Sequence, residues 1–434
     1  MIAECDHMLR IILCCVLLWS IPAAQAYSVL THEAIIDTAW DQNIVPLLVK
    51  RFPMSTPDEL IMAHGYAYAG AIIQDMGYYP FGSKLFSDLA HYVRSGDFIV
   101  TLIRDSQDLD EYAFALGALA HYASDTEGHS IAVNPAVAIE YPKLRRKFGR
   151  NVTYEDNPVA HIKVEFGFDV LQVARGKYAP QSYHDFIGFA VSKPLLGRAF
   201  ADTYGLKPEE VFDDFDLALG TYRRTVSKII PEMTRVAWRL KKDEIVNDRP
   251  GITRRRFEYN LSRASYRREW DDRFRQPGLG ARILAIFIRI IPKRGPLRAI
   301  DFKPPTAQTA TLFEESFNRT LTIYRNLLAQ AGEQRLALEN LDFDTGEPTR
   351  PARYRLADEA YSKLAIKLAA KDSAQVDPLV RDNILGYFRD LNQPFATRRK
   401  PKEWSETVTA LDKLRAEPGK PRNPAAAETS IAPR

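Results

Sequence analysis

Histidine and acidic residues recur at four-residue intervals in an apolar part of the chain, and this spacing is the feature that most constrains the fold. In His121-Tyr-Ala-Ser-Asp125-Thr-Glu-Gly-His129, three potential metal ligands lie at positions i, i+4 and i+8. A helix places residues at this spacing along one face. Residues 112–123 are rich in Ala and Leu, so we expect His121 on a buried helix, where an unpaired polar group is costly.

A second pair, His161 and Glu165, repeats the four-residue spacing, and the intervening Ile162 and Val164 can face a core. Imidazole and carboxylate groups together are a ligand set that suits zinc. The alternative is that these segments are two helices that carry surface pairs of histidine and acid. The apolar residues that precede His121 argue against that alternative.

The rest of the chain also has the pattern of helices. Apolar residues recur at intervals of three and four from Glu33 to about Val246, and no segment alternates with a period of two. Residues 308–331 and 353–370 have the helical pattern again. The sequence therefore predicts an all-α fold, a multi-helix bundle with a helical C-terminal extension.

The first 26 residues have the pattern of a secretory signal peptide. An apolar run, Ile11–Ile21, follows Arg10 and leads to Ala24-Gln25-Ala26, after which we expect cleavage. A membrane anchor is the alternative, but the run is shorter than the about 17 residues that a spanning helix needs. The only cysteines of the chain lie in this segment, at positions 5, 14 and 15. A secreted or periplasmic protein that begins at Tyr27 would have no disulfide and would need a core or a metal for stability.

Composition divides the chain further. The segment 248–304 interleaves arginines with aromatic residues and contains the apolar run 281–291, which is too short to span a bilayer. We expect either peripheral membrane contact through residues 254–294 or an ordinary helix packed on the main domain. The predicted units are a signal peptide (1–26), a catalytic helical domain (27–247), the basic aromatic segment with an amphipathic helix (248–304), a helical extension (305–392) and a disordered tail (393–434).

The overall charge of the 434-residue chain is nearly balanced. Its 59 Lys and Arg residues face 55 Asp and Glu residues. This balance does not mark a nucleic-acid-binding protein, so we expect no nucleic-acid partner.

Several residues, in their order along the chain, resemble the metal ligands of the zinc-dependent phospholipase C family of secreted bacterial enzymes. They are a terminal aromatic residue and a histidine in Tyr27-Ser-Val-Leu-Thr-His32, then Asp75, His91, His121-x-x-x-Asp125, His129 and His161-x-x-x-Glu165. The terminal segment and the 121–129 motif are similar to those of the catalytic domain of glycosylphosphatidylinositol-specific phospholipase D. The fungal single-strand nucleases resemble the same superfamily.

The resemblance implies two to three zinc ions and a ligand set for each. The first ion would be held by Asp75, His91, His121 and Asp125, and the second by His129, His161 and Glu165. The third would take the amine and carbonyl of Tyr27, His32, and Asp125 as a bridge.

The function implied is hydrolysis of phospholipids by a metal-activated water, which Asp75 would orient or deprotonate. Two alternatives stay open: a nuclease or nucleotidase of the same superfamily, and a non-catalytic binding protein stabilised by zinc. The sequence leaves the head group, C-type or D-type cleavage, and the oligomeric state undecided.

Overall fold

Helices make up nearly all the regular structure. The structure, a computed structural model, describes residues 28–176, 189–226, 230–257, 301–371 and 376–416. The elements up to residue 175 are α2 (Val29–Ala39), η1 (Trp40–Ile44), α3 (Val45–Arg51), α4 (Pro57–Gly70), η2 (Ile73–Tyr78), α5 (Lys84–Tyr92), α6 (Ser95–Asp105), α7 (Leu109–Glu127), η3 (Gly128–Val133), α8 (Asn134–Glu140), α9 (Pro142–Phe148) and α10 (Pro158–Arg175). The later elements are α11 (Lys193–Tyr204), η4 (Pro208–Glu210), α12 (Phe215–Arg224), α13 (Ile230–Asp248), α17 (Ala307–Gly332), β1 (Leu341–Asp342), β2 (Glu347–Pro348), α18 (Arg355–Ala369), α19 (Pro378–Tyr387), η8 (Ala396–Arg399) and α20 (Pro401–Ala416).

The predicted all-α fold is confirmed. Within the described ranges, strands occur only as the two-residue antiparallel pair β1–β2, in which Leu341 pairs with Pro348. Tyr27, the segment 1–26 and the apolar run 281–291 lie outside the described residues.

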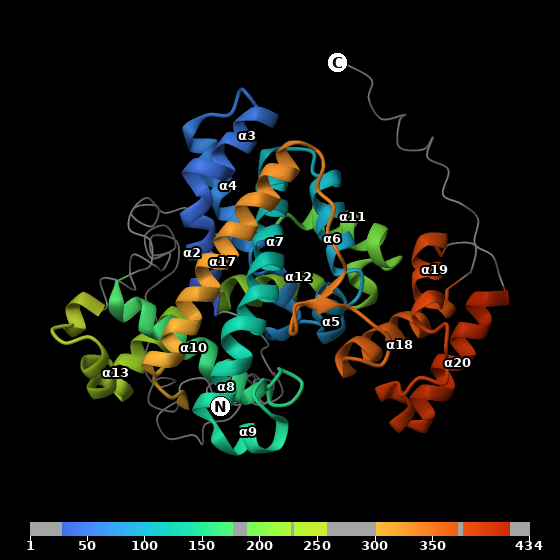
Figure 1. The fold of residues 1–434 in the computed structure, drawn as a ribbon. Helices are drawn as coiled ribbons and strands as arrows, with labels where there is room; N and C mark the ends of the chain where they lie inside the picture. The colour runs from blue at the N-terminus through green and yellow to red at the C-terminus, as the bar shows by residue number, and fades with distance from the viewer. Residues whose placement is uncertain (1–27, 177–188, 227–229, 258–300, 372–375, 417–434) are drawn as a thin grey trace, which may run out of the picture.

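Helix α7 is the central element of the fold. It begins after Asp108, whose side chain accepts a hydrogen bond from the backbone N–H of Glu111, and acids occupy its first turn, where they favour a helix N-terminus. Every residue from Glu111 to Thr126 is buried. Helices α4, α6 and α17 all pack against α7, as Figure 1 shows for the central part of the molecule. The buried helix expected around residues 112–123 is therefore present.

Two glycines let α4 and α7 cross at very short range. A Cβ atom added at Gly117 of α7 would lie 2.0 Å from the carbonyl oxygen of Ala67 in α4. A Cβ added at Gly70 of α4 would lie 2.0 Å from the carbonyl oxygen of Phe114 in α7. Both separations are shorter than any real contact of a Cβ atom, so the crossing requires glycine on both helices. It also sets the distance between α4 and His121, which lies one helical turn beyond Gly117.

The C-terminal part of the chain returns to the bundle. Helix α17 runs along α7 and η3, whereas α18 packs against α5 and is covered by α20 (Figure 1). The sequence predicts disorder from residue 393, and the structure differs over residues 401–416, which form α20. Ala410, Leu411 and Leu414 of this helix are buried, and their spacing of three and four is the apolar stripe of a packed helix.

None of the helices that the structure describes combines the length and the apolar character needed to cross a bilayer.

We expect Gly117→Ala to lower the free energy of unfolding by about 3 kcal/mol, because the added methyl group forces α4 and α7 apart. Denaturant unfolding of the variant and the wild-type protein measures this difference.

Gly197→Ala is the matched control. Gly197 lies inside α11, and nothing is within 4 Å of a Cβ added there. This change should be neutral or stabilise the protein by about 0.4–1 kcal/mol. Equal stability of the Gly117→Ala and Gly197→Ala variants would contradict the close crossing.

Candidate metal centre

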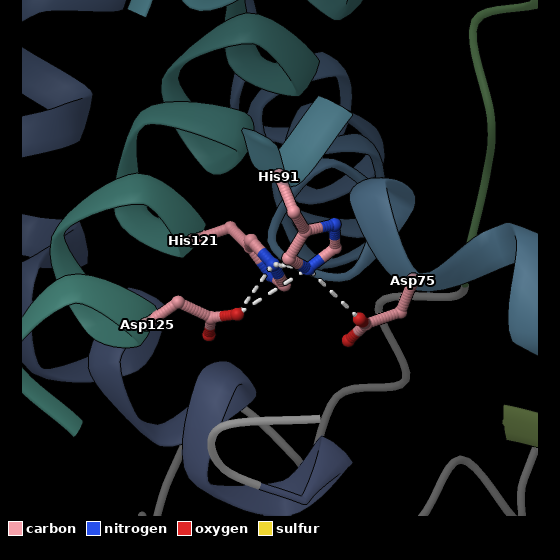
Figure 2. Close-up of side chains that lie close together, drawn as sticks. All are labelled: Asp75, His91, His121 and Asp125. Carbon is pink, nitrogen blue, oxygen red and sulfur yellow. Dashed lines mark hydrogen bonds and ion pairs between the residues drawn. The ribbon is translucent and has the colours of Figure 1, made fainter. Parts of the chain in front are cut away.

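Four of the predicted ligands meet in one buried cluster, which we call the primary cluster. Its members each offer one ligand atom, and these atoms all lie within 4.8 Å of one another (Figure 2). No side chain in the cluster is more than 3% exposed. The primary cluster consists of Asp75 from η2, His91 from α5, and His121 and Asp125 from α7.

Four of the distances within the primary cluster are close to those of a tetrahedral metal site. Nε2 of His91 lies 3.3 Å from Oδ1 of Asp75, 3.4 Å from Oδ2 of Asp125 and 3.4 Å from Nε2 of His121. Nε2 of His121 lies 3.1 Å from Oδ2 of Asp125. Ligands at 2.0–2.2 Å from a tetrahedral zinc ion lie about 3.3–3.6 Å from one another.

Backbone carbonyls orient both imidazoles. Nδ1–H of His121 donates to the carbonyl of Ala71 at 2.9 Å, and Nδ1–H of His91 donates to the carbonyl of Ser87 at 2.8 Å. These bonds leave the Nε2 atom of each ring for a metal. Ala71 follows α4 directly, so the glycine crossing also determines where its carbonyl meets His121.

Ser87 connects the Asp75 turn to the helix that carries His91. Its hydroxyl donates to the carbonyl of Gln74 and accepts a hydrogen bond from the backbone N–H of Gly77 at 2.9 Å. The side chain of Gln74 in turn donates to the carbonyl of Ala118 in α7 at 3.0 Å. These bonds join η2 to α5 and α7, so that Asp75 faces the two histidines.

Burial and mutual attraction set the charges of the primary cluster. Burial opposes ionisation of Asp125, but the attraction of His121 and His91 outweighs it and holds the pKa of Asp125 well below its usual value. Burial raises the pKa of Asp75, although both histidines act in the opposite direction. Burial also opposes the charged form of His91, but its contacts with Asp125 and Asp75 prevail and raise its pKa to about 10.

The primary cluster has the donors that zinc requires. Both carboxylate oxygens of Asp75 and of Asp125 are buried and make no hydrogen bond. Buried carboxylate oxygens without a hydrogen bond cost free energy unless a charge compensates for them; the histidines face them at 3.1–3.5 Å, and a metal ion would take over this compensation. Two imidazole nitrogens and two carboxylates at these separations therefore fit a zinc ion.

His32 lies beside the primary cluster and faces the other oxygen of Asp125. Its Nε2 atom is 3.5 Å from Oδ1 of Asp125, and its ring stacks on that of His121 with centroids 4.7 Å apart. Asp125 thus directs one oxygen to His32 and the other to His91 and His121. This is the arrangement that a bridging carboxylate between two ions needs, and Tyr27, the other ligand implied for that ion, lies outside the described residues.

An aspartate that the sequence analysis missed holds the segment that carries His32. Asp169 of α10 accepts hydrogen bonds from the backbone N–H of Leu30 at 3.1 Å and from the hydroxyl of Thr31 at 2.7 Å. A carboxylate at the first turn of a helix satisfies its free N–H groups. A signal was available, because Asp169 extends the spacing of His161 and Glu165 by another four residues.

The other three predicted ligands do not join the primary cluster. His129 follows α7 in the π-helical turn η3, which departs from the 3.6-residue period, so it leaves the face shared by His121 and Asp125. On α10, Nδ1 of His161 lies 3.5 Å from Oε1 of Glu165, while Nε2–H donates to the carbonyl of Val152. The rings of His129 and His161 have centroids 5.6 Å apart.

This second group differs from the primary cluster in its geometry, because among the described residues only the primary cluster brings three or more ligand atoms within 4.8 Å of one another. It also differs in its protonation. Burial lowers the pKa of His161 to about 4 and that of His129 well below its usual value. Burial raises the pKa of Glu165 well above its usual value. Both imidazoles are therefore neutral, which is the form that binds a metal. Nδ1 of His161 and both ring nitrogens of His129 make no hydrogen bond.

One more carboxylate faces this second group, and the sequence analysis did not identify it. Oδ1 of Asp344 lies 3.2 Å from Nδ1 of His129, and both side chains are 2% exposed. Asp344 comes from the turn between β1 and β2, in the part of the chain predicted as a helical extension. Its sequence neighbours offer only the acid-containing turn Asp342-Phe-Asp344-Thr-Gly346 as a signal.

Comparison with known proteins gives a match over part of the chain. Residues 31–212 match the family described as zinc dependent phospholipase C. No curated protein and no solved structure matches the chain. The matched segment includes His32, the primary cluster, His129, His161 and Glu165, and it ends before Asp344.

We expect the metal-free protein to bind zinc more tightly as the pH rises from about 6 to about 8. For each proton that zinc displaces, the affinity should increase about tenfold per pH unit. The pKa of His91 is raised to about 10, so this ring carries a proton throughout that range and must lose it to bind zinc. Titration calorimetry in buffers of different ionisation enthalpy counts the released protons. An affinity that does not change with pH, without proton release, would contradict the charged state of His91.

Proposed function

We propose that the chain is a secreted phosphodiesterase of the zinc-dependent phospholipase C family, which residues 31–212 match, and that it hydrolyses phospholipids at a site with two to three zinc ions. The observation that carries this proposal is the buried primary cluster, whose four ligand atoms all lie within 4.8 Å of one another. The apolar run before Ala24-Gln25-Ala26 supports export. Cleavage between the phosphate and the glycerol of the lipid is the reaction we propose, with D-type cleavage as the variant to be tested.

Zinc bound by the primary cluster would supply a Lewis acid for a phosphoryl oxygen and lower the pKa of a bound water to about 7. The chain's own residues position this chemistry. His91 and His121 are fixed by the carbonyls of Ser87 and Ala71, so their Nε2 atoms need no reorientation. Rigid donors lower the reorganisation that a reaction requires.

Asp75 is the group that we assign to the water. Its Oδ1 atom faces His91, and its Oδ2 atom is buried without a hydrogen bond. Asp125, in contrast, directs both of its oxygens toward histidines. Asp75 is therefore the carboxylate of the primary cluster that can hold a water and accept its proton. Its pKa, raised by burial, makes it a stronger base than an exposed aspartate.

One set of assays tests the proposed function against the two alternatives. The zinc-loaded protein is incubated with phosphatidylcholine, with a phosphatidylinositol and with single-stranded DNA. Release of water-soluble phosphocholine indicates C-type cleavage, and release of free choline indicates D-type cleavage. Turnover of DNA alone would favour the nuclease alternative, and no turnover of any substrate would favour a zinc-stabilised binding protein.

We expect Asp75→Asn to reduce kcat for phospholipid hydrolysis by about 10²–10⁴-fold while the fold is retained, because an amide can neither bind zinc as an anion nor accept the proton. Phosphate-ester turnover and circular dichroism measure the two effects.

Asp216→Asn is the control, since it makes the same chemical change on a side chain that is 78% exposed. It should keep wild-type turnover. Near-wild-type hydrolysis by Asp75→Asn would exclude the role given to Asp75.

A further inference from the structure

Asp344 is part of a rigid unit that lies outside the matched family segment. The β1–β2 hairpin positions it, since the side chain of Asp342 accepts a hydrogen bond from the backbone N–H of Asp344 at 2.9 Å. The side chain of Asn134 donates to the carbonyl of Asp344 at 2.7 Å. Gly346, at a φ of 72°, brings the hairpin so close to α7 that an added Cβ would lie 2.7 Å from the carbonyl oxygen of Thr126.

The two carboxylate oxygens of Asp344 have different surroundings. Oδ2 accepts hydrogen bonds from the hydroxyls of Tyr92, at 2.9 Å, and Tyr354. Oδ1 faces Nδ1 of His129 at 3.2 Å, yet that nitrogen makes no hydrogen bond. The two tyrosines therefore fix the carboxylate in an orientation that directs its other oxygen toward His129.

The separation of Asp344 and His129 is that of two ligands of one ion. Within the primary cluster, nitrogen–oxygen pairs lie 3.1–3.4 Å apart, and His161 and Glu165 lie 3.5 Å apart. The 3.2 Å separation between His129 and Asp344 falls in the same range without the alignment of a hydrogen bond. His129 is buried, and neither of its ring nitrogens makes a hydrogen bond. Such an imidazole needs a cation or a hydrogen-bond acceptor, and a cation shared with the carboxylate of Asp344 would meet that need.

We propose that Asp344 is a ligand of the second metal ion, together with His129, His161 and Glu165, and that the bound ion would draw the pairs His129–Asp344 and His161–Glu165 closer together than they lie here. This inference rests on the proposed function, which places more than one ion in the site. It adds a fourth ligand, from beyond residue 212, to the three that the resemblance implies. With Asp344 as the fourth ligand, the ion would be bound by two carboxylates instead of one. The added negative charge favours retention of a divalent cation.

The first experiment measures metal content. The full chain is stripped with a chelator, reloaded with Zn²⁺ and dialysed, and bound zinc is counted by mass spectrometry. We expect Asp344→Asn to lose one ion relative to wild type and to weaken its binding by about 100-fold, as His129→Ala also should. Glu347→Gln is the matched control, because it removes the same charge from an exposed position of the same hairpin and should keep all ions.

The outcomes separate this proposal from the proposed function. If Asp344→Asn retains every ion with unchanged affinity, Asp344 is not a ligand, and the multi-zinc site remains. If the wild-type protein itself retains a single ion, the second position is wrong, and the proposal for Asp344 is wrong with it.

A second variant gives a signal that does not depend on loss of binding. Asp344→Cys loaded with Co²⁺ should show a thiolate-to-cobalt charge-transfer band, because thiolates bind this ion directly. Glu347→Cys places a thiol in the same hairpin away from the site, and both variants share the cysteines at positions 5, 14 and 15. A band of equal strength in both variants, or no band in Asp344→Cys despite bound cobalt, would overturn the proposal.

Discussion

The contact between Asp125 and three histidines is the interaction on which the site depends. A buried carboxylate costs several kcal/mol unless charges or donors compensate for it. Asp125 is compensated by His32 from α2, His91 from α5 and His121 from its own helix. Because its two oxygens face different partners, one side chain fixes the relative positions of three helices. The same geometry directs the two oxygens of the carboxylate to different partners, as a carboxylate that bridges two cations requires.

Backbone contacts around Asp125 and the histidines restrict the orientation of the ligand side chains. Gly70 and Gly117 bring α4 and α7 together, and the carbonyl that orients His121 comes from the residue that follows α4. Ser87 plays the corresponding role for His91 and for the turn that carries Asp75. Rigid packing of helices thus replaces the flexible loops on which many sites are built. The cost is that small changes in helix packing reach the ligands directly.

The sequence predicts those parts of the site that depend on one element. His121 and Asp125 lie one turn apart on a single helix, so spacing alone brings them together, and the same holds for His161 and Glu165. Asp75 and His91 come from other elements, and only a resemblance could associate them with α7. The π-helical turn at His129 breaks the four-residue spacing of the helix face. The spacing of the side chains in the sequence does not predict such a turn. The sequence does not predict α20, because the segment is rich in charged residues and proline and its apolar stripe is short.

Asp344 shows where sequence reasoning ends and what the fold adds. No periodicity connects residue 344 to residue 129, and their contact exists only because α17 returns the chain along α7 and the hairpin then docks on α5 and η3. Phe343 of this hairpin also packs its ring 5.2 Å from that of His91. Residues 16–434 contain no cysteine, so no disulfide can hold these distant segments together. A ligand that binds only the folded state stabilises it by RT ln(1 + [L]/Kd), about 2.7 kcal/mol at a hundredfold excess over Kd. Metal bound by residues from α2, α5, α7, α10 and the hairpin would therefore stabilise the contacts between them, and its loss would weaken the hairpin together with the site.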